Sequence, residues 1–175
     1  SNQLPREKLR LLLNYDPDRV LTPLHRPNPR ADGIIYLGNK GLNLVKLLRL
    51  GLPVPPGFII TTEVFRCREI LEAFAPAKRN LDEQIVHSIR ELEQITGKRF
   101  GAADNPLLFS VRSGSSISQP GMMDTFLNVG MNEEIAQGLA AKSGNAWFAW
   151  DSYRRFLQCY GMGLGLRRDD FDAII

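Results

Sequence analysis

The spacing of apolar and polar residues predicts a chain built mainly of helices joined by a few short strands. From Leu42 to Leu50 apolar residues recur at helical spacing, and Gly51 follows as a residue type that ends helices. Thr61 or Thr62 offers a cap for the next helix, which Pro76 is expected to end. Further helices are predicted over residues 80–96, 132–141 and 145–160.

Short apolar runs bounded by turn residues predict the strands. Such runs lie at Val54–Ile60, Leu107–Val111 and Thr125–Val129, the first of them entered through prolines. Another short apolar element, Ile34–Leu37, leads into the glycine-rich turn Gly38–Gly41. The order of elements predicts an α+β protein with a small mixed sheet and flanking helices, followed by a helical subdomain.

The expected organisation has three parts. Residues 1–33 contain a short helix over Glu7–Asn14 and a proline-rich stretch, and are interpreted as an extension or linker arm. Residues 34–130 form one lobe of a domain, and residues 131–175 form a helical segment that is cut off at its carboxyl end. We therefore expect the chain to be part of a longer polypeptide.

Composition narrows the classes of function. No apolar run is long enough for a membrane span, and no signal peptide is apparent, so a cytoplasmic protein without a membrane partner is expected. The net charge of +3 comes from scattered Lys and Arg, which argues against a nucleic-acid partner. Cys67 and Cys159 lie in helical stretches without the spacing of a zinc or disulfide framework, and are interpreted as buried apolar residues.

Lys40 is the first candidate for binding chemistry. It lies in the turn Gly38–Gly41, at the start of a predicted helix, where unpaired amides and the helix dipole already favour an anion. A phosphate would neutralise both the lysine and the helix end. The alternative is an ordinary solvent-exposed lysine in a turn.

The second candidate is the segment Ser110–Thr125, which follows a predicted strand. Arg112 offers a planar fork for phosphate oxygens, and the small and hydroxyl residues after it offer amides and hydroxyls. The alternative is a surface loop without a ligand.

Other features carry less weight. Gly161, Gly163 and Gly165 follow a helical stretch instead of a strand, and a Walker phosphate loop is absent from the sequence. His25 and His87 lack the surroundings of a catalytic histidine and are interpreted as surface residues. An aromatic series at helical spacing is interpreted as core: Trp147, Trp150, Tyr153, Phe156 and Tyr160.

Several motifs, in order along residues 34–175, carry a family resemblance. They are Gly38–Leu44, Leu50–Phe58, Ile60–Glu63, Ser110–Gly114, Pro120–Thr125 and Phe148–Phe156. Together they resemble the pyruvate, phosphate dikinase and phosphoenolpyruvate synthase family, with the Pro-Gly-Met-Met-Asp-Thr form closer to the dikinase. The resemblance implies the amino-terminal part of an ATP-grasp-like nucleotide-binding domain.

The resemblance also implies roles for particular residues. The nucleotide phosphates are expected to contact Lys40, Arg112, Ser113, Gly114, Gly121 and Thr125. ATP and Mg²⁺ are the implied cofactors. Asp124 is a candidate for positioning the metal indirectly, while the metal ligands themselves are expected after residue 175. The implied reaction passes a phosphoryl group from ATP toward a carrier histidine, for interconversion of pyruvate and phosphoenolpyruvate.

The same comparison limits what this chain does alone. The carrier histidine and the part that handles pyruvate and phosphoenolpyruvate are expected in other domains of the same polypeptide, so the chain has no catalytic residue of its own and is expected to be inactive by itself. Asn39 stands where the family usually has a glycine. The alternative function is a non-catalytic module that senses nucleotide or mediates assembly on the same scaffold.

Overall fold

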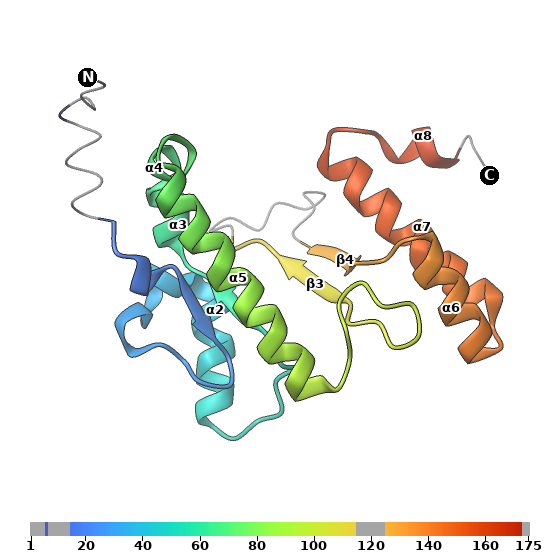
Figure 1. Cartoon of the computed structure of the whole chain (residues 1–175), viewed down its shortest axis with the longest axis horizontal. Coiled ribbons are helices and arrows are strands. Elements are labelled where there is room, and N and C mark those ends of the chain that lie inside the picture. The colour runs from blue at the N-terminus through green and yellow to red at the C-terminus, as the bar shows by residue number, and fades with distance from the viewer. Residues whose placement is uncertain (1–5, 7–14, 115–124, 173–175) are drawn as a thin grey trace. The chain divides into compact units, whose positions relative to one another are not determined.

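The computed structural model describes residues 6, 15–114 and 125–172, which form two compact units (Figure 1). The first unit extends to residue 95 and the second begins at residue 96. The described residues hold seven α-helices and two two-stranded antiparallel sheets, so the chain is of the mixed α+β kind that the sequence predicts. The single mixed sheet expected from the sequence is replaced, in these residues, by the two small sheets.

The first sheet lies in the amino-terminal unit and pairs two segments far apart in sequence. β1 (Leu21–Pro23) runs antiparallel to β2 (Phe58–Ile60), with Thr22 opposite Ile59. The segment around β1 is held by the short helices η1 (Pro17–Arg19) and η2 (Pro29–Ala31), each capped by a side chain. Pro23 ends β1, a position where the missing N–H removes no inner ladder bond.

Helix α2 (Ile34–Arg49) contains an internal break. Gly38 has φ 61° and ψ −178°, a combination available almost only to glycine, so residues 34–37 form one helical turn and a second helix begins directly after Gly38. The helix ends at Arg49, and Gly51 follows the C-cap Leu50. There the amide of Leu52 donates to the carbonyl of Leu47 and the amide of Gly51 donates to the carbonyl of Leu48.

Three further helices complete this unit (Figure 1), and they contribute side chains to a small core. They are α3 (Thr62–Arg66), α4 (Arg68–Ala73) and α5 (Ala75–Thr96). The hydroxyl of Thr61 caps α3, as the sequence predicts. The buried apolar residues of this core are Val20, Leu21, Cys67, Ile70, Leu71, Ala77 and Leu81.

The second unit is a hairpin packed on helices. β3 (Phe109–Arg112) pairs antiparallel with β4 (Thr125–Val129), which packs on α7 (Ala146–Gly163). Helix α6 (Glu133–Ser143) packs on α7, and α8 (Arg168–Asp172) follows. The core of this unit is formed by Met131, Ile135 and Ala136, with Tyr153 and Phe156 against them.

Three expectations about secondary structure and packing need correction or lie outside the described residues. The single helix expected between Thr61 and Pro76 is divided at Cys67 into α3 and α4. α4 ends at Ala73, before Pro76, and Pro76 itself lies in the first turn of α5, where a proline removes no helical hydrogen bond. Trp147, Trp150 and Tyr160 are exposed, so only part of the aromatic series is core. The helix predicted over 7–14 lies outside the described residues.

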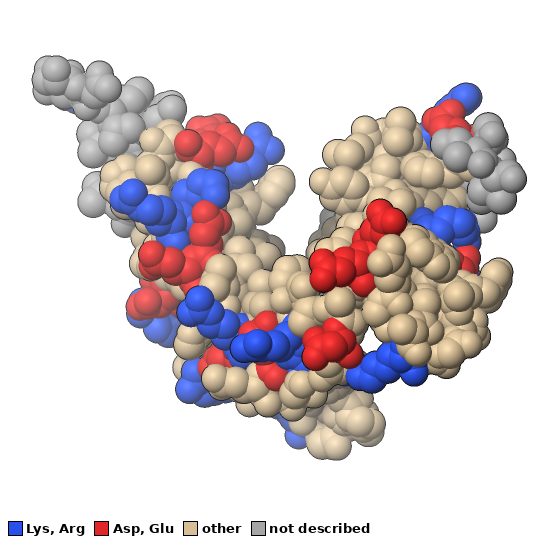
Figure 2. Space-filling view, turned by 45° about the vertical axis from the view of Figure 1, so that its right-hand side comes forward, with Lys and Arg blue, Asp and Glu red and all other residues tan. Residues whose placement is uncertain are grey.

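Charge is mixed on the surface. On the face drawn in Figure 2, basic and acidic side chains lie among one another instead of forming one basic block. Among the described helices, none is both long and apolar enough to cross a membrane.

Candidate functional site

Lys40 lies in the first turn of the helix that begins after Gly38. Its side chain is exposed, and the non-helical backbone of Gly38 separates the turn 34–37 from the helix in which Lys40 lies. Lys40 thus lies near a helix start, as the sequence predicts, and this start lies inside α2. A cation at this end of a helix favours an anionic neighbour.

The turn that carries Lys40 is held close to β2 by Gly41. Gly41 is buried, and a Cβ atom at this position would lie 3.1 Å from Cδ1 of Ile59 and 3.3 Å from Cβ of Leu37. The absence of a side chain thus lets α2 approach the β1–β2 sheet. This packing sets where Lys40 stands relative to the sheet of its own unit.

Arg112 and Thr125 are brought together by the second sheet. They are directly opposite one another in the β3–β4 ladder, so their side chains project from the same face. Ser113 and Gly114 follow Arg112 at the same end of the hairpin, and Arg112, Ser113 and Gly114 are all exposed. One end of this hairpin therefore gathers a guanidinium, two hydroxyl side chains and a glycine.

These residues form two groups, one in each unit. Lys40 belongs to the first unit, and Arg112, Ser113, Gly114 and Thr125 belong to the second. Gly121 and Asp124, which the resemblance also points to, lie outside the described residues.

The described part of the chain offers no ready ligand set for Mg²⁺. No group of three or more His, Cys, Asp or Glu side chains in it is arranged to hold a metal ion.

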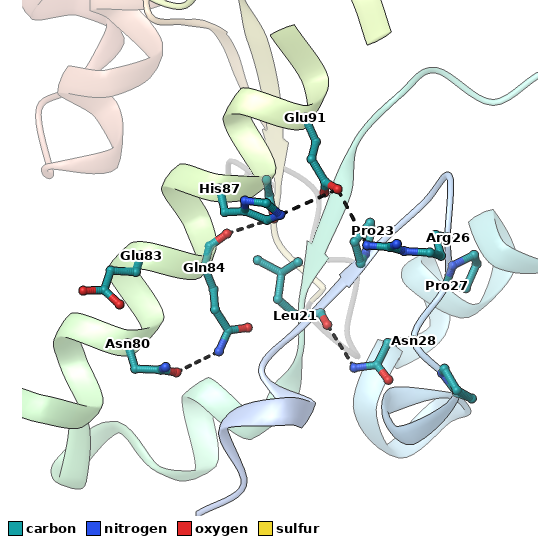
Figure 3. A pocket seen from close by; sticks show the side chains of 12 residues that line it. Leu21, Pro23, Arg26, Pro27, Asn28, Asn80, Glu83, Gln84, His87 and Glu91 are labelled. Atoms are coloured by element: carbon teal, nitrogen blue, oxygen red, sulfur yellow. Dashed lines mark hydrogen bonds and ion pairs between the residues drawn. The ribbon is translucent and has the colours of Figure 1, made fainter. Parts of the chain in front are cut away.

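A pocket of about 490 Å³ lies elsewhere in the first unit, between α5 and the segment around β1 (Figure 3). Gln84, His87, Ser88 and Glu91 line it from α5, and Leu21 and three prolines line it from the other side. Sequence reasoning did not find this pocket, because its two walls are about sixty residues apart and neither carries a recognisable motif.

The carboxylate of Glu91 lies close to three basic side chains at this pocket. It lies 3.8 Å from Nε2 of His25, 3.7 Å from Nε2 of His87 and 3.7 Å from Nη2 of Arg26. The prediction that both histidines lie at the surface fits their partly or largely exposed side chains. The cluster ties the proline-rich segment to α5 and contains none of the predicted phosphate-binding residues.

Comparison with known proteins gives a consistent answer. The chain is 49% identical over 137 residues to pyruvate, phosphate dikinase of Giardia intestinalis, and 46% identical over 140 residues to that of Rhizobium meliloti (strain 1021). It is 50% identical over 125 residues to pyruvate, phosphate dikinase 1, chloroplastic, of Oryza sativa subsp. japonica. The chain is homologous to part of pyruvate, phosphate dikinase.

The alignments cover most of this chain but only a small part of each relative. The first two alignments cover 78% and 79% of this chain but 15% of each dikinase, and the rice alignment covers 71% of this chain and 13% of that dikinase. The chain thus spans about a seventh of the length of these relatives. No protein-family model matches the chain.

Proposed function

We propose that this chain is the ATP-binding portion of a phosphotransferase of the pyruvate, phosphate dikinase type. In this role it holds the phosphates of ATP while a phosphoryl group passes toward a carrier histidine in another domain. The observation that carries the proposal is the pairing of Arg112 with Thr125 at one end of a hairpin, beside Ser113 and Gly114, in a chain homologous to dikinases.

The chemistry of these groups suits triphosphate. A guanidinium binds two phosphate oxygens at once, and hydroxyls and backbone amides donate to the others. Lys40 adds a second cation at a helix start, and a phosphate is the kind of anion that such a start attracts. Phosphoryl transfer depends mostly on this kind of positioning and charge neutralisation, and Mg²⁺ is expected to be held by residues beyond those described.

The test is titration of the chain with ATP and Mg²⁺ by calorimetry, beside Lys40→Ala and Arg112→Ala. Matched controls are Lys46→Ala, an exposed lysine later in α2, and Arg99→Ala, an exposed arginine of the second unit. We expect each site variant to weaken binding about tenfold or more, since a charge-assisted contact contributes roughly 1.5–3 kcal/mol. Equal binding by site and control variants would contradict the proposal.

In the full-length dikinase, the same substitutions should slow phosphorylation of the carrier histidine. A module that only senses nucleotide would bind ATP through the same residues but leave the carrier unphosphorylated. This measurement therefore separates the proposed enzyme function from the non-catalytic alternative.

A further inference from the structure

The β3–β4 ladder changes register partway along. Phe109 lies opposite Val129, whereas Val111 lies opposite Phe126 and Arg112 opposite Thr125. β3 therefore advances two residues where β4 advances three. The extra residue makes a β-bulge in β4, a feature that re-aims the side chains beyond it.

Asn128 lies within this bulge and has an unusual backbone. Its φ is 56°, and it is the one residue other than glycine with positive φ in the described part of the chain. Asparagine is among the few side chains that tolerate this left-handed conformation. The residue type at this position thus matches the conformation that the bulge requires.

The side chain of Asn128 connects the bulge to α7. Its Nδ2 donates a hydrogen bond of 3.1 Å to the backbone carbonyl of Ser152. A second contact joins Phe126 to the same helix, because its ring packs on Gly163, where a Cβ atom would come within 2.6 Å of the ring. The bulged part of β4 is therefore attached to α7 through both Asn128 and Phe126.

The bulge decides which residue faces Arg112. If the register of Phe109 and Val129 continued without it, Arg112 would lie opposite Phe126, and Thr125 would lie opposite Ser113. Opposite residues share a face of the sheet. The one-residue shift at the bulge therefore places the hydroxyl of Thr125, instead of an aromatic ring, beside the Arg112 guanidinium.

We propose that Asn128 is a positioning residue for the phosphate site, acting through the register of β4. Its left-handed backbone and its bond to Ser152 hold the bulge, and the bulge sets Thr125 beside Arg112. The ligand part of this inference rests on the proposed function, whereas its structural part concerns the ladder alone.

The experiment compares Asn128→Gly, Asn128→Ala and Asn128→Asp in the whole chain. Glycine keeps the left-handed conformation accessible, aspartate tolerates it, and alanine disfavours it. None of the three can donate the side-chain bond to Ser152, so they differ mainly in the backbone. Backbone nuclear Overhauser effects between Arg112 and Thr125 report the register, and titration with ATP and Mg²⁺ reports the site.

We expect Asn128→Ala to lose those cross-strand signals and to weaken ATP binding about fivefold or more. Asn128→Gly should keep the signals and bind within about twofold of the wild type, because the left-handed backbone stays accessible. Its loss of the bond to Ser152 should appear as a lower thermal stability. The control is Asn145→Ala, which removes the side-chain cap of α7 in the same unit and leaves β4 unchanged.

Intact cross-strand signals in Asn128→Ala would overturn the inference. So would a loss of ATP binding in Asn128→Gly or Asn145→Ala as large as the loss in Asn128→Ala. If Asn128→Ala does not fold, Asn128→Gly and Asn128→Asp still test the proposal. Asn128→Asp should keep the register at a reduced thermal stability. A changed register in Asn128→Gly would contradict the proposal. A wild-type chain that binds no ATP would refute the proposed function, while the cross-strand signals would still test the register.

Discussion

The hydroxyl of Tyr36 accepts a hydrogen bond of 2.6 Å from Nη1 of Arg19, and the guanidinium carbon of Arg19 lies 5.5 Å from the centre of the tyrosine ring. Tyr36 lies in the single helical turn before Gly38, and Arg19 lies at the end of η1. The contact fixes the turn that precedes Lys40 to the segment that leads into β1.

Replacing Tyr36 by Phe should lower the free energy of unfolding of the first unit by about 1 kcal/mol, since the change removes one hydrogen bond and keeps the ring. Urea denaturation measures the difference. The matched control is Tyr160→Phe, whose exposed side chain should leave stability nearly unchanged. Equal stability of the two variants would show that the bond to Arg19 contributes little.

The backbone break at Gly38 gives a second prediction. Gly38→Ala should destabilise the first unit by roughly 1–3 kcal/mol, because φ 61° with ψ −178° is a conformation that a Cβ atom disfavours strongly. Gly51→Ala provides the comparison, since Gly51 follows the end of α2 in the same unit and has φ 73°. The loss should be larger at Gly38. A smaller loss of stability in Gly38→Ala than in Gly51→Ala would mean that α2 does not need a glycine at position 38.

The buried carboxylate of Glu63 gives a third prediction. It accepts a hydrogen bond of 3.1 Å from Nε of Arg66 and lies beside Cys67, and only 5% of its side chain is exposed. Glu63→Gln should cost about 2 kcal/mol of unfolding free energy, because charge-assisted bonds to a buried carboxylate are replaced by weaker ones.

The control for Glu63 is Glu72→Gln. This change breaks the solvent-exposed pair of Glu72 and Arg68 within α4, the helix after α3. That change should cost less than about 1 kcal/mol. Thermal unfolding of the two variants gives the comparison, and similar losses would indicate that the burial of Glu63 adds nothing to its pairing.

The two cysteines should differ in reactivity. Burial, reinforced by the nearby Glu63 carboxylate, raises the pKa of the Cys67 thiol, so that it stays protonated at neutral pH. The thiolate is the reactive form. Iodoacetamide at pH 7.5 should therefore modify the half-buried Cys159 and spare Cys67 until denaturant is added. Mass spectrometry of the peptides measures this, and early labelling of Cys67 would show that the core around it opens readily.

Local sequence signals located several elements accurately. Asn132 and Asn145 were predicted to begin helices, and in the structure their side chains accept hydrogen bonds from the amides of Ile135 and Phe148. A cap is a short-range interaction, so its residues are visible in the sequence itself. The same holds for Gly51, whose role at the end of α2 depends only on its own backbone.

Signals with two physical meanings were less informative. A proline both ends one helix and suits the first turn of the next, and Pro76 takes the second role. The aromatic residues of α7 show a similar ambiguity, because helical spacing identifies a stripe but not the face that is covered. Tyr153 packs in the core, while Trp147 is 76% exposed.

The candidate site shows the same division between local and long-range information. The sequence pointed to Arg112 and Thr125 through their neighbours, but it did not reveal that the two residues are opposite one another. That relation depends on the bulge at Asn128, which a strand pattern with period two cannot encode.

Arg112 and Thr125 are cross-strand partners in a ladder that is built from backbone hydrogen bonds. These bonds are made by the main chain and do not depend on the identity of either side chain. Either residue can therefore be exchanged while the other keeps its position. The chemistry offered at this end of the hairpin can change in this way without a change of fold.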